Sequence, residues 1–132
     1  MRDVADEPPI EAAKRELHEE ADLTAATWHV LADFFPSGGG SSEAVRIFLA
    51  RDLAEVPQAD RHTRTDEERD MVGAWVSLDE VLAAIVAGRV HASSMVVGAM
   101  AADLARRSGW STLRPADAEW LSPPANRRRE GV

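Results

Sequence analysis

Apolar residues recur at helical spacing in three parts of the chain. The first part begins at Pro8 and Pro9, which suit a helix start because proline at the first helical position loses no needed hydrogen-bond donor. We expect this helix to run to about Ala21. Apolar residues at the same spacing predict two further helices, over 78–88 and 93–107.

Three helix ends carry specific signals. Asp22 follows the first helix where a left-handed residue is common; glycine is usual there, and aspartate tolerates that conformation better than most residues. Ser77 with Glu80 three residues later has the pattern of a capping box. The last helix is expected to stop at Ser108-Gly109. These signals set the predicted boundaries.

Strand-like patterns lie between the first helix and the last two. We predict strands over 27–35, 44–53 and 71–78, with a flexible turn over 36–42 and a long polar loop over 55–70. The order is therefore helix, strand, strand, long loop, strand, helix, helix, which indicates an α/β fold with a thin sheet. The edges of such a sheet are usually paired or covered.

The length of 132 residues is enough for one domain with a real core. We expect that domain over 1–109 and an extended tail over 110–132. The chain enters its first helix almost at once, and the predicted sheet has few strands. We therefore expect that a complete domain has a further portion upstream of Met1, and that this chain alone is poorly soluble or weakly active.

Composition excludes several classes of function. The net charge of −8 argues against a general affinity for nucleic acid or anionic membranes, and Arg127 to Arg129 suit a solvated terminus better than a binding patch. There is no cysteine, and no segment has the pattern of a membrane span or a signal peptide. We expect a cytoplasmic protein.

The first helix gathers negative charge. Glu16, Glu19 and Glu20 fall within roughly a 100° arc of the helix surface, apart from the apolar stripe. A solvated acidic face is the ordinary interpretation, because like-charged pairs on an exposed helix cost only about 0.2–0.5 kcal/mol each. In a cleft, two carboxylates about 5 Å apart repel by roughly 3 kcal/mol, which favours a bound cation. The helix alone leaves both interpretations open.

A resemblance to a known protein family favours a bound cation over a solvated acidic face. Glu7, seven residues, and then RELHEEADL (15–23) resemble the Nudix box, G-x5-E-x7-R-E-U-x-E-E-x-G-U, where U is a bulky apolar residue. Two positions depart from it: Asp22 replaces the second glycine, and the first glycine would fall on Met1 or just before it. The segments LADFFPSGGGSSEAVRIFLARDL and DEERDMVGAWVSLDEVLAAIVAGRV resemble the ADP-ribose pyrophosphatase branch of this family.

The resemblance implies an α/β/α sandwich with a mixed sheet, here without its N-terminal strands, and a homodimer when complete. It implies Mg²⁺- or Mn²⁺-dependent hydrolysis of ADP-ribose, or a related nucleoside diphosphate sugar, to AMP and a sugar phosphate. The alternative is a non-catalytic Nudix-like fragment or interaction module. Metal-dependent hydrolysis distinguishes the two.

The implied site residues are carboxylates and one arginine. Glu16 and Glu20, one helical turn apart, can share a metal ion, and Glu19 extends the acidic face to a second ion. Arg15 lies four residues from both Glu11 and Glu19 and can hold a carboxylate in place. The resemblance implies that Glu7, together with Arg15, supports the metal site. The group that activates water is expected in the loop before the third strand, at Glu68 or, as the second choice, Glu67.

Other patterns have plainer explanations. The four histidines share no metal-ligand spacing, so each is expected at the surface or in packing. SGGG at 37–40 lacks the lysine and helix of a P-loop. Trp28, Trp75 and Trp110 could stack on an adenine, but core packing is the default.

Overall fold

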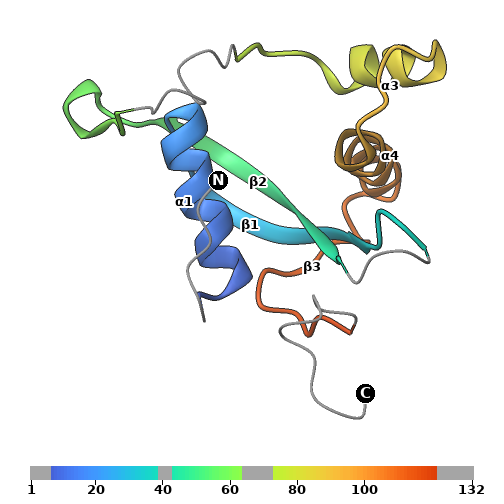
Figure 1. Ribbon diagram of the computed structural model, residues 1–132, viewed down its shortest axis with the longest axis horizontal. Helices are drawn as coiled ribbons and strands as arrows, with labels where there is room; N and C mark the ends of the chain where they lie inside the picture. The colour runs from blue at the N-terminus through green and yellow to red at the C-terminus, as the bar shows by residue number, and fades with distance from the viewer. Residues whose placement is uncertain (1–6, 39–42, 64–72, 122–132) are drawn as a thin grey trace. The chain divides into compact units, whose positions relative to one another are not determined.

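The computed structural model describes residues 7–38, 43–63 and 73–121 (Figure 1). The elements in these ranges are, in order, α1 (Pro9–Ala21), β1 (Leu23–Phe34), β2 (Val45–Glu55), the 3₁₀ turn η1 (Gln58–Asp60), α3 (Leu78–Val86), α4 (Ser93–Arg107) and β3 (Arg114–Pro115). The strands form one sheet in the order β2-β1-β3. Helices with a sheet confirm the α/β class. No described helix is long and apolar enough to cross a membrane.

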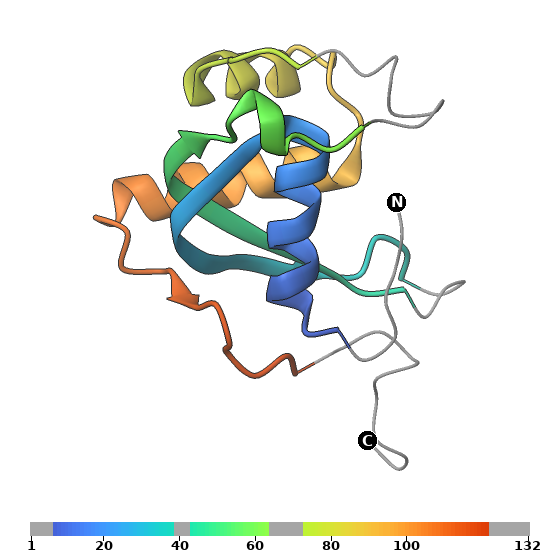
Figure 2. The same ribbon diagram turned by 90° about the vertical axis from the view of Figure 1, so that its left-hand side faces the viewer.

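The chain divides into two compact units, 1–28 with 50–75, and 29–49 with 76–132. Both long strands contribute to each unit. In the first unit the chain turns sharply from α1 into β1 (Figure 2). The residue between them is Asp22, whose φ of 56° and ψ of 39° are left-handed as predicted. The Val56 amide donates to the Asp22 carbonyl at 2.9 Å. Because Val56 is buried, this bond fixes the end of α1 against the chain that leaves β2.

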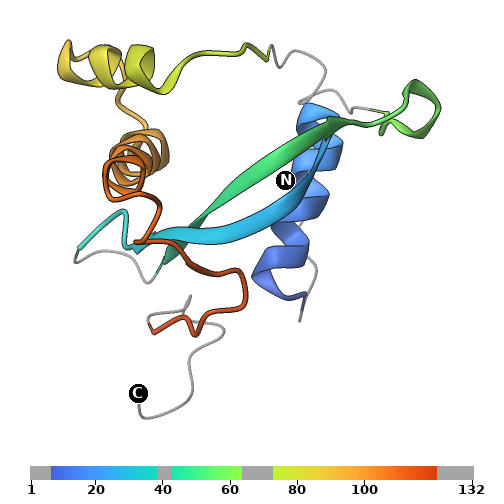
Figure 3. The same ribbon diagram turned by 180° about the vertical axis from the view of Figure 1, so that it is seen from behind.

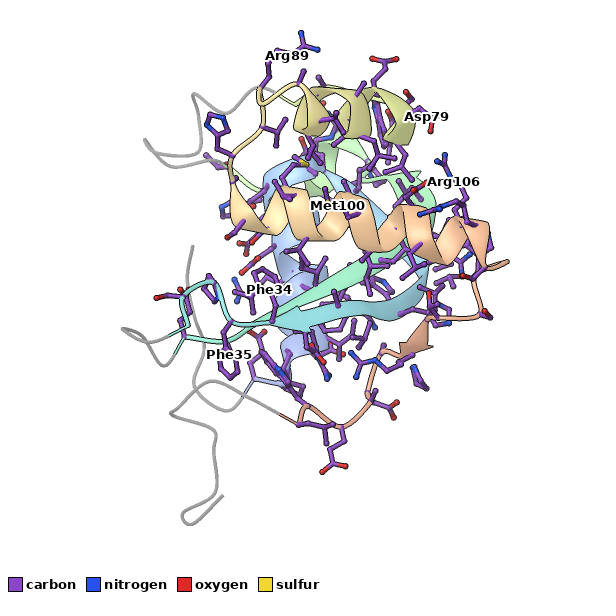
Figure 4. The ribbon with its side chains drawn as sticks, turned by 90° about the vertical axis from the view of Figure 1, so that its right-hand side faces the viewer. Phe34, Phe35, Asp79, Arg89, Met100 and Arg106 are labelled. Atoms are coloured by element: carbon purple, nitrogen blue, oxygen red, sulfur yellow. The ribbon has the colours of Figure 1, made fainter. Side chains whose placement is uncertain are left out.

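The second unit contains α3 and α4, which lie against each other (Figure 3). The Ser77 hydroxyl accepts from the Glu80 amide at 3.1 Å, so the predicted cap forms. Asp79 of α3 and Arg106 of α4 form an ion pair at 2.8 Å (Figure 4). Gly98 of α4 faces Ile47 of β2 closely enough that an added Cβ would meet the Ile47 side chain at 3.6 Å. These contacts join the helix pair to the strand.

The third predicted strand is wrong over the residues that can be assessed. Residues 73–77 form no strand, while residues 71 and 72 lie outside the described ranges. Trp75 is 81% exposed and Val76 52% exposed. An alternating pattern becomes a strand only when a neighbouring strand accepts and donates its hydrogen bonds, and no described strand pairs with this segment.

Other boundaries shift in smaller ways. β1 begins at Leu23, before the predicted 27, and β2 continues to Glu55. The predicted turn over 36–42 and loop over 55–70 lie partly outside the described ranges. The tail was expected to be extended, and its residues Arg114 and Pro115 pair antiparallel with Val30 and His29 of β1. The tail thus supplies the third strand of the sheet.

Candidate metal centre

The acidic face of α1 is only partly open to solvent. The side chains of Glu16, Glu19 and Glu20 are all half-buried, whereas Glu11 on the same helix is exposed. Burial of carboxylates costs free energy unless a cation or hydrogen bonds compensate. Glu11 therefore meets the solvent, whereas Glu16, Glu19 and Glu20 are partly withdrawn from it, and Glu19 lies beside Arg15.

Arg15 is the best-defined side chain of this face. Its Nη2 lies 2.9 Å from Glu7 Oε1 and its Nε lies 3.4 Å from Glu7 Oε2, so the guanidinium grips the carboxylate on two sides. Both side chains are less than one-fifth exposed. Arg15 Nη1 also lies 3.7 Å from Glu19 Oε2. The hydrogen bond to Glu7 is the main cause of a raised pKa for Arg15; burial lowers this pKa, and the charges of Glu7, Glu19 and Glu16 raise it further.

Part of the expected pairing is different. Arg15 was placed within reach of both Glu11 and Glu19, but Glu11 pairs with Lys14 at 3.8 Å. Glu7, eight residues before Arg15, takes the place of Glu11. Pro8, which separates Glu7 from the helix, is extended, with ψ of 141°. The arginine therefore bridges the segment before α1 and the middle of the helix.

The donor chemistry fits a hard divalent cation. Carboxylate oxygens are the ligands that Mg²⁺ and Mn²⁺ prefer. Within the described ranges, no three or more Asp, Glu or His side chains are arranged to hold one metal ion. Magnesium commonly takes only one or two carboxylates and completes its shell with water and substrate phosphate. Glu16, Glu19 and Glu20 could supply those carboxylates, while Glu67 and Glu68 lie outside the described ranges.

A second ionic cluster was not found by sequence reasoning. Asp33 accepts from Arg46 at 2.7 Å and 3.1 Å, and from Arg114 at 2.7 Å. Burial alone would raise the pKa of Asp33, but the hydrogen bonds from both arginines outweigh it and the pKa lies below its usual value. Arg46 is a charged residue within the predicted strand 44–53, yet its side chain is only 4% exposed. A strand pattern gives no signal for this, because the groups that Arg46 bonds, Asp33 and the carbonyls of Ala118 and Glu119, are 13, 72 and 73 residues away.

The sequence matches known proteins over most of its length. Residues 4–95 match the sequence model of the NUDIX domain. The chain is also 40% identical over 133 residues to a protein of Mycobacterium tuberculosis (strain ATCC 25618 / H37Rv) named ADP-ribose pyrophosphatase. This match covers 98% of the chain and 62% of that relative, so the chain spans less than two-thirds of the relative's length.

Proposed function

The chain belongs to the NUDIX family, and from that premise we propose that it is a metal-dependent hydrolase of a nucleoside diphosphate sugar, with ADP-ribose as the preferred substrate class. The products would be AMP and a sugar phosphate. The observation that supports this most strongly is the Glu7–Arg15 pair beside the half-buried carboxylates of α1. The name of the M. tuberculosis relative supports the choice of ADP-ribose.

Each residue of α1 has a separate role in this proposal. Glu16, Glu19 and Glu20 would hold Mg²⁺ or Mn²⁺, which when bound neutralises diphosphate charge that bare carboxylates would repel. Arg15, held by Glu7 on one side, keeps the Glu19 carboxylate in a fixed orientation. Glu68, or Glu67 beside it, would accept the proton of the attacking water, so that the new P–O bond forms as the bridging P–O bond breaks.

The substrate class is tested by comparing ADP-ribose, nucleoside triphosphates and other nucleoside diphosphate sugars with Mg²⁺ present. We expect release of AMP from ADP-ribose to exceed hydrolysis of triphosphates. A clear preference for triphosphates would overturn the substrate class. No metal-dependent hydrolysis of any of these compounds, by a folded protein, would instead favour the non-catalytic module.

The carboxylate roles are tested by substitutions that remove one charge each. Glu20→Gln should lower activity mainly through weaker metal use, with partial rescue at higher Mg²⁺. Glu68→Gln should lower turnover while the Mg²⁺ dependence stays close to that of the wild type. Glu11→Gln is the matched control, because Glu11 is on the same helix, is exposed, and pairs with Lys14. Identical Mg²⁺ titrations for the wild type and Glu20→Gln would remove Glu20 from the metal site.

The positioning role of Arg15 is tested by the Mg²⁺ requirement of a further variant. Arg15→Lys keeps the charge but loses the two-sided grip on Glu7. Outer partners of metal ligands are typically worth about 10- to 100-fold in metal affinity or activity. We therefore expect the Mg²⁺ concentration for half-maximal activity to rise by about tenfold or more, without loss of thermal stability beyond that of the Glu11→Gln control. An unchanged Mg²⁺ requirement would show that Arg15 serves the fold alone.

A further inference from the structure

The second unit contains a cavity with an aromatic wall and an arginine at its side. Its volume is about 260 Å³, and it is lined by Asp33, Phe34, Phe35, Arg114 and Leu121. The two phenylalanines lie at the end of β1, on the far side of α4 from Arg89 (Figure 4). Phe35 is 45% exposed and Leu121 75% exposed, so large apolar surface faces the solvent here. A cavity of roughly 150 Å³ can hold a benzene ring, so this one has room for a ring and a small substituent.

The cavity lining has one charged group of each sign, Asp33 and Arg114, while the ionic cluster to which they belong also includes Arg46 behind the lining. One carboxylate, Asp33, meets two guanidinium groups, which leaves one positive charge in excess. Arg46 uses its N–H groups on Asp33 and on the carbonyls of Ala118 and Glu119, at 2.7 Å and 3.1 Å for the carbonyls. Its side chain is 4% exposed, so it is not available to a ligand.

Arg114 differs from Arg46 in how many of its N–H groups make hydrogen bonds. Its Nη2 donates to Asp33 at 2.7 Å, and within the described ranges its Nε and Nη1 have no hydrogen-bond partner. Its side chain is 41% exposed. The ion pair with Asp33 holds the guanidinium in place and leaves its other N–H groups available. Two N–H groups of a planar guanidinium can bind a phosphate or a carboxylate together.

We propose that this cavity binds a small molecule with a planar aromatic ring and one phosphate group, with the ring against Phe34 and Phe35 and the phosphate on Arg114. None of these residues belongs to the acidic face of α1, so the cavity is separate from the proposed metal site. Its use by AMP rests on the proposed function, whose product is AMP, whereas its use by another aryl phosphate does not. Phenyl phosphate and AMP share the required chemistry. They differ in that AMP places a ribose between the ring and the phosphate.

Binding is measured by titration calorimetry in EDTA, so that no divalent metal contributes. Phenyl phosphate and AMP are each compared with probes that lack one feature: inorganic phosphate, phenol and adenosine. We expect at least one of the two complete probes to bind about tenfold or more tightly than its incomplete counterparts. Amide chemical shifts of Asp33, Phe34, Phe35 and Arg114 should change on titration, which places the ligand in the cavity.

Variants separate the two parts of the site. Arg114→Met should weaken binding of the complete probe by about 10- to 100-fold, the range for a hydrogen bond to a charged group, and leave the weak binding of phenol or adenosine unchanged. Phe35→Ala should weaken the complete probe by about 3- to 10-fold and leave inorganic phosphate unchanged. Arg89→Met is the matched control, since Arg89 is exposed and carries the same charge.

The outcomes are distinct. Tighter binding of AMP assigns the site to nucleotides, and tighter binding of phenyl phosphate assigns it to compact aryl phosphates. No binding of either probe overturns the proposal. The proposal is also overturned if Arg89→Met weakens binding as much as Arg114→Met does. If Arg114→Met unfolds, Arg114→Lys and Phe35→Ala decide the matter, because the lysine keeps the charge on Asp33 while losing the two-pronged contact.

Discussion

Replacing Arg46 by methionine tests the ionic cluster most directly. Methionine keeps an unbranched apolar stem but removes the guanidinium. The substitution deletes the hydrogen bonds to Asp33 at 2.7 Å and 3.1 Å, and those to the carbonyls of Ala118 and Glu119. It also removes the cation from above the Trp120 ring, whose centre lies 5.0 Å from the guanidinium carbon. The change therefore removes the contacts of Arg46 with Asp33 of β1 and with the tail at the same time.

The expected loss follows from burial. The side chain of Arg46 is 4% exposed and that of Asp33 is 19% exposed, so removing one partner leaves a largely buried charge. Breaking a buried pair in this way typically costs about 3–5 kcal/mol. Arg114 still donates to Asp33, which places the loss at the lower end, about 3 kcal/mol. This is a large fraction of the roughly 5–15 kcal/mol by which domains are stable.

The measurement is urea unfolding followed by tryptophan fluorescence. With a slope of about 2 kcal/mol per molar urea, the midpoint should fall by about 1.5 M. Arg107→Met is the control: Arg107 is 69% exposed, pairs with Asp103 at 3.1 Å, and should cost no more than about 1 kcal/mol. If Arg46→Met destabilised the protein no more than Arg107→Met, the cluster would not hold the tail, and the reasoning from burial would be refuted.

Three further predictions concern stability. Two arginines lower the pKa of Asp33, so its contribution to stability should be complete above its ordinary pKa of 3.8 and lost as the pH falls through the lower folded value. The free energy of unfolding should therefore depend less on pH in that range for Asp33→Asn than for the wild type. An unchanged pH dependence would contradict this. Asp22→Gly should raise the free energy of unfolding by about 0.5–1 kcal/mol, because glycine adopts the left-handed conformation without strain, and a lower melting temperature would argue against it. Gly98→Ala should stabilise α4 by a similar amount, about 0.5–1 kcal/mol, since its Cβ would meet Ile47 at an ordinary 3.6 Å; Gly98→Leu should destabilise, and equal melting temperatures for the two variants would be inconsistent with this packing.

Local chemistry in the sequence determined most of the helical elements. Pro9 begins α1, Asp22 ends it in a left-handed conformation, and Ser77 caps α3 through the Glu80 amide. Each of these interactions joins residues within one helical turn, so the sequence neighbourhood contains both partners. The same is true of the spacing that places three glutamates on one face of α1, since helix geometry alone sets that arc.

Tertiary structure decided where distant residues meet. The tail supplies β3 because residues 114–115 pair with the edge of β1, whereas residues 73–77, which belong to a predicted strand, have no described strand as a partner. The Arg46 side chain is only 4% exposed because Asp33 and the carbonyls of Ala118 and Glu119 contact it. Strand pairing and the burial of a charge depend on partner residues that are distant in the sequence. A short stretch of sequence contains only one of the two partners, so its pattern predicts that a strand can pair but not with which strand. The partner strand and the burial of each charge are fixed only once the chain has folded.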